Sequence, residues 1–300
     1  MPADGGRQAR DFLIIGAMKA GTTSLYRFLT SHPDVGGPMR KELHYFSLGK
    51  ARFGLAGYRF LLRKARGSIV GEASPSYTEY PRFGDVARRI RLLLPSVRLI
   101  YCVRDPLDRM RSHYMHEVLQ ARECPGAPWR EEYLRPSLYG HQLAWYLRYF
   151  EPSALAVVDA RYLRTNREAA LRTIFVFLGV DDAWATNVDT GDLNVSAGRA
   201  RLSPRLARLN RSSTVQALGR HAPPHLRATL RTVMSWVPST TGEGSANPAG
   251  AVPPMPSTIL QRLEQDRSLF LPQLQDCVVV SDRQPDTWWK PPPAVSTNPP

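Results

Sequence analysis

The 300-residue chain contains little cysteine and lacks long apolar runs. Its three cysteines, Cys102, Cys124 and Cys277, are odd in number and widely spaced, so they predict neither a disulfide framework nor a metal-binding pair. No stretch approaches the roughly 18–20 apolar residues that a membrane-spanning helix needs. The apolar run at 12–15 is too short for the core of a secretory signal. We therefore expect a cytoplasmic protein without a membrane span.

Lysine is also scarce: of 40 basic residues five are Lys and the other 35 are Arg, and the net charge is +14. Eight arginines fall between Arg199 and Arg231, and no acidic residue occurs between Asp192 and Glu243. Such a charge favours a polyanionic partner, a phosphorylated cofactor or a membrane surface, although the codon bias of a GC-rich genome explains an arginine excess equally well. The overall composition excludes a disordered, collagen-like or coiled-coil protein.

Short apolar runs alternate with helical patterns along the first 180 residues. Strands are predicted at 12–15, 97–103 and 155–158. Helices are predicted after Thr22, from Pro106 to about Leu119, between Tyr139 and Phe150, and up to Leu178, where Gly179 ends the helix. Strands separated by helices predict an α/β fold with a parallel sheet covered on both sides.

The chain organisation that we expect has one main domain. It comprises a flexible N-terminus (1–10), the domain itself (11–235), a flexible Pro/Gly/Ser-rich loop (236–258), a C-terminal helix and tail that pack on the domain (259–290, with the helix at 259–274), and a disordered tail (291–300).

A glycine loop, Gly-Ala-Met-Lys-Ala-Gly-Thr-Thr at 16–23, lies between the first predicted strand and helix. This placement exposes backbone N–H groups and a helix N-terminus to an anion. The glycine spacing matches a Walker A loop, but Thr22 stands where that loop has lysine, and Lys19 lies inside the loop instead. The next predicted strand ends in Arg104 rather than in an acidic residue. These features disfavour a nucleoside triphosphatase and leave phosphate binding.

Four segments resemble sulfotransferases that use 3′-phosphoadenosine 5′-phosphosulfate (PAPS). The stretch 12–25 is similar to their 5′-phosphosulfate loop, and 103–114 (VRDPLDRMRSHY) is similar to their 3′-phosphate motif. The strings KELHYF at 41–46 and SAGR at 196–199 resemble the heparan sulfate N- and 3-O-sulfotransferase branch. The four segments occur in family order.

The resemblance implies a three-layer, P-loop-like sulfotransferase fold with a central parallel β-sheet flanked by helices, and transfer of a sulfuryl group from PAPS. No motif calls for a metal.

The resemblance also implies roles for individual residues. Lys19 would stabilise the charge that develops on the departing phosphate, since sulfuryl transfer, like phosphoryl transfer, depends on positioning and charge stabilisation. Arg104 would bind the 3′-phosphate, assisted by Ser112, whereas Arg109 and Arg111 are expected to be solvated. The candidate cofactor-binding residues are Lys19, Ala20, Gly21, Thr22, Thr23, Ser24, Arg104, Ser112, Ser196, Gly198 and Arg199.

A general base must take the proton of the acceptor hydroxyl or amine. Glu42 is the first candidate, because the heparan sulfate branch carries its base at the corresponding glutamate. His44 is the competing candidate, since an ordinary histidine titrates near neutral pH. Lys41 and Arg40 are candidates for contacting an acidic acceptor, with a solvated turn as the alternative.

The segment 71–77 departs from the family pattern at one position. The resembling family segment has a lysine where this chain has Ala73. Either one cationic donor is missing, or another residue, such as Lys41, replaces it. Glu72, in the same segment, is a candidate polar contact near the acceptor.

Two other functions compete with the sulfotransferase interpretation. A P-loop nucleotide kinase would bind ATP with magnesium, and a basic nucleic-acid-binding module would use the arginines at 199–231. The absence of a Gly-Lys-Ser/Thr sequence argues against the first, and no DNA-reading motif supports the second. The acceptor stays open among a carbohydrate, a glycolipid and a secondary metabolite, and the oligomeric state stays open as well.

Overall fold

A computed structural model describes residues 11–38, 40–120, 122–188 and 252–289. The chain forms two compact units, one comprising 1–109, 134–193 and 256–300, and the other 110–133 and 194–255. The candidate residues Ser196, Gly198 and Arg199 lie outside the described residues, as do the arginine-rich segment and most of the Pro/Gly/Ser-rich loop.

The first unit is built on a six-stranded sheet in which every described pairing is parallel. Its strand order is β2 (Val35–Gly36), β3 (Ile69–Ala73), β1 (Phe12–Gly16), β4 (Arg98–Val103), β5 (Leu155–Asp159) and β6 (Val278–Val280). From β1 the chain first builds toward β3 and β2, and then toward β4, β5 and β6. The order therefore reverses between β1 and β4, and ligands of open parallel sheets bind at such a switch point, beyond the carboxyl ends of the strands.

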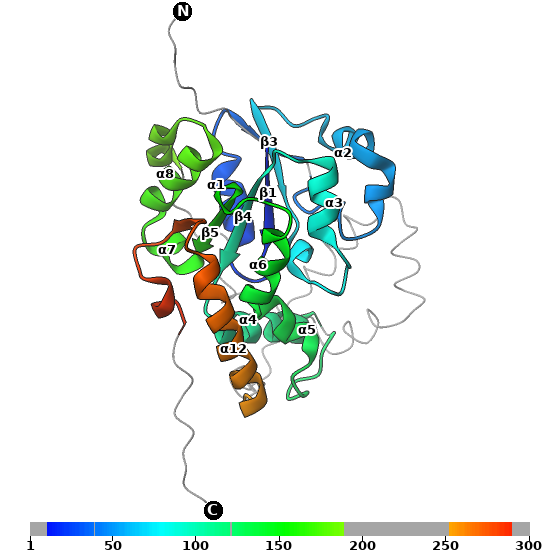
Figure 1. Cartoon of the computed structure of the whole chain (residues 1–300), viewed down its shortest axis with the longest axis vertical. Coiled ribbons are helices and arrows are strands. Elements are labelled where there is room, and N and C mark those ends of the chain that lie inside the picture. The colour runs from blue at the N-terminus through cyan, green and yellow to red at the C-terminus, as the bar shows by residue number, and fades with distance from the viewer. Residues whose placement is uncertain (1–10, 39, 121, 189–251, 290–300) are drawn as a thin grey trace, which may run out of the picture. The chain divides into compact units, whose positions relative to one another are not determined.

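Helices cover both faces of this sheet (Figure 1). One side carries α1 (Thr22–Leu29), α7 (Ala160–Thr165) and α8 (Arg167–Leu178). The other side carries α3 (Val86–Leu93) and α6 (Tyr139–Leu147), and α12 (Ser257–Gln273) packs on α6. The chain also forms α2 (Gly54–Leu62), α4 (Pro106–Leu119), α5 (Glu131–Leu134) and short 3₁₀ turns, among them Pro75–Thr78 after β3. The predicted parallel α/β architecture is confirmed.

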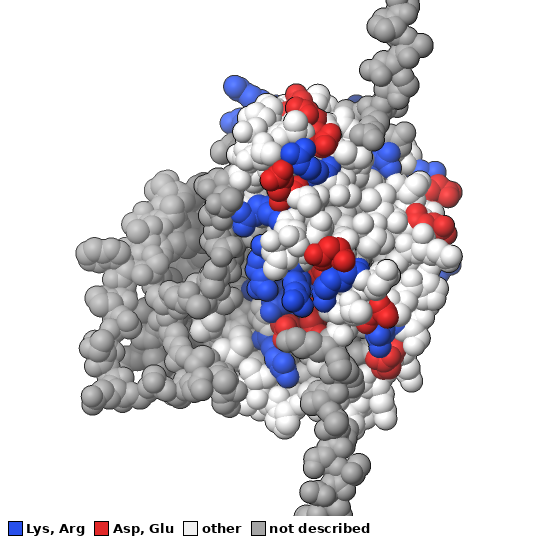
Figure 2. Space-filling view, turned by 90° about the vertical axis from the view of Figure 1, so that its left-hand side faces the viewer, with Lys and Arg blue, Asp and Glu red and all other residues white. Residues whose placement is uncertain are grey.

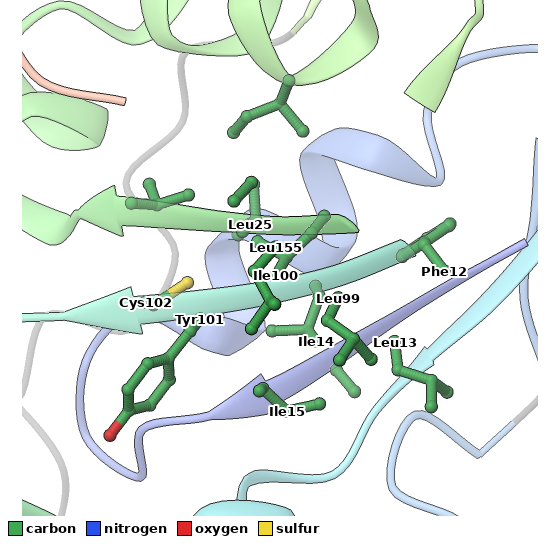
Figure 3. Close-up of a cluster of buried hydrophobic side chains, with 14 of the residues drawn as sticks. Phe12, Leu13, Ile14, Ile15, Leu25, Leu99, Ile100, Tyr101, Cys102 and Leu155 are labelled. Carbon is green, nitrogen blue, oxygen red and sulfur yellow. The ribbon is translucent and has the colours of Figure 1, made fainter. Parts of the chain in front are cut away.

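The central strands are buried on both faces (Figure 3). All five residues of β1 and of β5 are buried, and side chains from β1, β4, β5 and α1 fill the space around them. This double burial is why these strands read as continuous apolar runs. The strands predicted from those runs are confirmed, as are the helices at Pro106–Leu119 and in the C-terminal segment.

The described part of the second unit is small. It contains the later turns of α4, which begins in the first unit, and an aromatic cluster of Tyr114, Trp129 and Tyr133. The indole N–H of Trp129 donates to the carbonyls of Pro253 and Pro254, at 3.3 and 3.1 Å. These bonds attach residues 252–255, the described end of the segment 194–255, to the segment 110–133.

A buried carboxyl group joins α12 to the start of α6. Asp266 accepts hydrogen bonds from the backbone N–H groups of Gly140 and His141, at 2.8 and 2.7 Å. Burial nevertheless raises its pKa from the usual 3.8 to about 6. The protonated form is therefore favoured by folding.

We expect this group to lower the stability of the protein as the pH rises. Between about pH 4 and pH 6 the unfolded chain has released the proton of Asp266 and the folded chain has not, so about 3 kcal/mol is lost across that window. Urea unfolding of the wild type and of Asp266→Asn at several pH values measures the difference in slope. Asp276→Asn is the control, because it removes an exposed carboxyl group. If the free energy of unfolding changed with pH by the same slope in the wild type and in Asp266→Asn, the prediction would be contradicted.

Candidate active site at the carboxyl edge of the sheet

Loops from three neighbouring strands meet at the carboxyl edge of the sheet. The N–H of Ala17, just after β1, donates to the carbonyl of Cys102 in β4 at 2.7 Å. The N–H of Ser74, just after β3, donates to the carbonyl of Ile14 in β1 at 3.2 Å. In addition, the N–H of Ala73 donates to the carbonyl of Lys41 at 3.2 Å, which brings the segment 41–46 to the same edge.

The glycine loop follows β1 and ends at α1. A side chain at Gly16 would place its Cβ 1.9 Å from the hydroxyl oxygen of Thr78, so the close approach of the loop and the turn after β3 requires glycine here. Gly21, the N-cap of α1, has a φ of 85°, and Lys19 has a φ of 67°. The backbone N–H groups at the start of an α-helix are a binding site for anions, which fits the predicted phosphate loop.

Arg109 lies behind this loop. The expectation that its side chain is solvated is therefore wrong. Its side chain is fully buried, with 0% exposure, and burial lowers the pKa of its guanidinium. The guanidinium donates to the carbonyl of Met18 at 3.2 Å and to the hydroxyl of Ser137. Arg109 thus holds the loop from inside the protein. Arg109 is the second arginine of the R-x-P-x-x-R pattern, so its place in the motif is visible in the sequence, whereas its burial is not.

Arg104 directly follows β4. Hydrogen bonds to Tyr139 hold its backbone, and its side chain is partly exposed. The hydroxyl of Tyr139 donates to its carbonyl at 2.8 Å and accepts from its N–H at 3.3 Å. Asp105 caps α4 by accepting from the N–H of Asp108 at 2.9 Å. The side chain of Arg104 is 40% exposed, and its guanidinium lies 3.9 Å from the carboxylate of Asp108. Ser112 lies in the part of α4 that belongs to the second unit.

Both candidate bases lie in one chain of polar contacts. The ammonium of Lys41 lies 3.1 Å from Oε1 of Glu42, whose Oε2 lies 3.3 Å from Nε2 of His44. The Nδ1 atom of His44 lies 2.8 Å from the hydroxyl of Ser76. At the other end of the chain, Lys41 donates to the hydroxyl of Thr23 in the glycine loop at 2.9 Å. The structure therefore brings Glu42 and His44 together and connects them to the loop.

These neighbours keep the carboxyl group of Glu42 ionised. The hydrogen bond from His44 lowers the pKa of Glu42 most, the charge of Lys41 lowers it further, and partial burial opposes both, which gives a pKa of about 2. The side chain is 40% exposed, so it is open to solvent on one side. An ionised carboxylate can accept a proton, and a pKa this low makes it a weak base while these contacts last.

A second glutamate, Glu72, is fully buried at the end of β3, with 0% exposure. Its Oε2 accepts from the hydroxyl of Ser74 at 2.5 Å and from the N–H of Leu43 at 3.3 Å, and its Oε1 accepts from the hydroxyl of Tyr77. Burial raises its pKa. Glu72 is thus an internal hydrogen-bonding group, which does not fit its expected role as a polar contact near the acceptor.

The two hydroxyl groups that donate to Glu72 also hold the segment of the candidate bases. Ser74 Oγ accepts from the N–H of His44 at 2.9 Å, and the Tyr77 hydroxyl accepts from the N–H of Tyr45 at 3.0 Å. With the bond from Leu43, three consecutive N–H groups are bound by side chains that follow or end β3. No short pattern predicts this arrangement, because the partners are about 30 residues apart.

The two remaining predicted arginines are both exposed. Arg40 is exposed, as a solvated turn requires, and Arg111 is exposed as expected. On the face drawn in Figure 2, basic and acidic side chains of the described residues are interspersed. The arginines at 199–231, on which the nucleic-acid-binding alternative depends, lie outside the described residues. No helix among the described residues is long and apolar enough to cross a bilayer.

Comparison with known proteins identifies the family. Residues 9–190 match the model of the sulfotransferase domain, which is more than half of the chain. The chain belongs to this family. This sulfotransferase is 32% identical over 194 residues to heparan sulfate glucosamine 3-O-sulfotransferase 6 of Homo sapiens, covering 59% of this chain and 54% of the relative. It is 28% identical over 194 residues to bifunctional heparan sulfate N-deacetylase/N-sulfotransferase 3 of Mus musculus, covering 56% of this chain and 22% of the relative.

A solved structure shows the same fold. The sulfotransferase from Alicyclobacillus acidocaldarius superposes with a TM-score of 0.54 at 24% identity, covering 86% of this chain and 95% of that one. The chain therefore has the P-loop-like sulfotransferase fold and is similar to the heparan sulfate N- and 3-O-sulfotransferases. It spans about half the length, or less, of these curated relatives.

The Tyr77 hydroxyl should stabilise the site more than an ordinary buried hydroxyl does. Tyr77→Phe removes a donor from the buried carboxyl of Glu72 and an acceptor from Tyr45, so we expect a loss of about 1–3 kcal/mol in the free energy of unfolding. Urea unfolding measures it. The control is Tyr146→Phe, whose buried hydroxyl donates to one backbone carbonyl, that of Tyr77, at 3.0 Å. A Tyr77→Phe protein no less stable than the control would contradict this assignment.

Proposed function

We propose that this sulfotransferase transfers the sulfuryl group of PAPS to a hydroxyl or amine of a carbohydrate, glycolipid or secondary-metabolite acceptor, leaving adenosine 3′,5′-bisphosphate (PAP). The observation that carries the proposal is the position of Lys41 between Thr23 of the glycine loop, at 2.9 Å, and the candidate base Glu42, at 3.1 Å. Sulfuryl transfer needs a base and a donor-binding loop in this proximity. The relatives named for heparan sulfate support a saccharide acceptor in particular.

The residues at the sheet edge fit a nucleotide with phosphate groups at both ends. The N–H groups from Gly21 to Ser24 and the hydroxyls of Thr22, Thr23 and Ser24 suit the 5′-phosphosulfate. The N–H of Ala20 donates instead to the carbonyl of Ala17 at 3.1 Å. The partly exposed side chain of Arg104 suits the 3′-phosphate through paired hydrogen bonds. We add Ser112 on the family resemblance alone. We extend the donor site to Ser196, Gly198 and Arg199 on the family resemblance alone.

The reaction is an in-line displacement at sulfur. Glu42 accepts the proton of the acceptor as the acceptor oxygen or nitrogen forms its bond to sulfur. The bond from sulfur to the phosphate oxygen breaks, and its electron pair stays on that oxygen. Lys19 donates to the oxygen on which this charge collects. His44 holds Glu42 in place or takes the proton itself.

Binding of the bisphosphate tests the donor assignment. We expect the wild type to bind PAP and PAPS in calorimetry without magnesium and to prefer PAP to adenosine 5′-monophosphate, which lacks the 3′-phosphate. Arg104→Ala should lower that preference about 10- to 100-fold, because a charge-assisted pair is lost.

Arg111→Ala is the matched control, since Arg111 is an exposed arginine on α4. If the wild type bound neither PAP nor PAPS, the proposed function would be wrong. Tight binding of ATP with magnesium instead would favour the nucleotide kinase.

The base is tested by transfer. PAPS with a labelled sulfur atom, offered with the enzyme to a lysate of the source organism, should label one class of molecule and thereby identify the acceptor. Glu42→Gln should retain the affinity for PAP and lose transfer about 10²- to 10⁴-fold.

Glu168→Gln provides the control, because Glu168 is an exposed glutamate paired with Arg172 on α8. Full turnover by Glu42→Gln would move the base to His44. Loss of PAP binding in Glu42→Gln would show instead that Glu42 serves the donor site.

A further inference from the structure

Lys41 contacts the glycine loop rather than solvent. Its side chain is 17% exposed, and its ammonium lies within 3.5 Å of three oxygen atoms. The hydroxyl of Thr23 is at 2.9 Å, that of Thr22 at 3.5 Å and the carboxylate of Glu42 at 3.1 Å. Two of the three acceptors are neutral hydroxyls at the start of α1, where the backbone already favours an anion. A cation is therefore held at the place where the donor's negative charge is expected.

The backbone of Lys41 is fixed by the end of β3. Its carbonyl accepts from the N–H of Ala73, and the next residues are held through Glu72 and Ser74. Position 73 itself carries only a buried methyl group, where the resembling family segment carries a lysine. Position 73 at the end of β3 thus carries no cation, and Lys41 carries one on the backbone segment that is hydrogen-bonded to this strand end.

We propose that Lys41 is a second cationic catalytic residue, which contacts the 5′-phosphosulfate of the donor and replaces the lysine absent at Ala73. This inference rests on the proposed function. When the donor binds, the ammonium turns from the hydroxyls of Thr22 and Thr23 and from Glu42 toward the oxygens of the phosphosulfate, and it shares with Lys19 the charge that develops as the bond to sulfur breaks.

This movement also affects the base. Lys41 is one of the two neighbours that lower the pKa of Glu42, and His44 is the other. A carboxylate that loses its ammonium partner to the donor becomes a stronger base. Lys41 therefore couples the arrival of the donor to the basicity of the group that activates the acceptor.

Two nucleotides isolate the contribution of Lys41. PAP carries a 5′-phosphate and adenosine 3′-monophosphate does not, so the ratio of their affinities reports contacts to the 5′ group. Lys41→Met should lower this ratio about 10- to 100-fold and leave the affinity for adenosine 3′-monophosphate unchanged. At saturating PAPS, transfer of labelled sulfur should also slow at least about 10-fold.

Lys64→Met is the control, since it removes the same charge from an exposed position. The retained affinity for adenosine 3′-monophosphate shows that the variant is folded. A wild-type affinity ratio, or an unchanged rate at saturating PAPS, would overturn the role of Lys41 while the wild type still binds PAP. Failure of the wild type to bind PAP would refute the proposed function instead.

Discussion

The geometry of the site depends on the burial of one carboxyl group, that of Glu72. Removing a carboxyl group from water costs several kcal/mol unless hydrogen bonds replace its hydration. Ser74, Tyr77 and the N–H of Leu43 supply those bonds. Since the same two hydroxyls accept from the N–H groups of His44 and Tyr45, satisfying the carboxyl group also fixes the segment that carries Glu42 and His44. The position of the candidate bases thus follows from the polar end of a buried strand.

That polar end also explains where sequence reasoning failed on the fold. The runs at 12–15, 97–103 and 155–158 are apolar because β1, β4 and β5 are buried on both faces, so they could be predicted. β3 is also an internal strand, but it contains Gly71 and Glu72, and these residues interrupt the apolar pattern. β6 is only three residues long. β2 is two residues long. These three strands were missed, and with them the strand order that places β1 between β3 and β4.

Within the site, local features could be predicted and tertiary contacts could not. The glycine loop, the arginine after β4 and the two candidate bases are recognisable from residue types and spacing near strand ends. The burial of Arg109 under Met18 depends on how α4 packs, and the contact between Lys41 and Thr23 depends on the crossing of two loops. Neither contact is encoded in a short pattern, because the first joins residues 91 positions apart and the second residues 18 positions apart.

The few lysines of the chain add information about the site. In a chain that uses arginine for 35 of its 40 basic residues, positive charge alone does not locate a binding site. Three of the five lysines nevertheless lie in the glycine loop or the segment 41–46, or contact them. Lys19 lies in the loop, Lys41 donates to Thr23, and the ammonium of Lys50 donates to the carbonyl of Leu43 at 2.8 Å. An ammonium is a compact charge that fits between several oxygen atoms, whereas a guanidinium needs a planar partner. In this composition a lysine is therefore more informative than an arginine, and Lys19 and Lys41 both belong to segments at the carboxyl edge of the sheet.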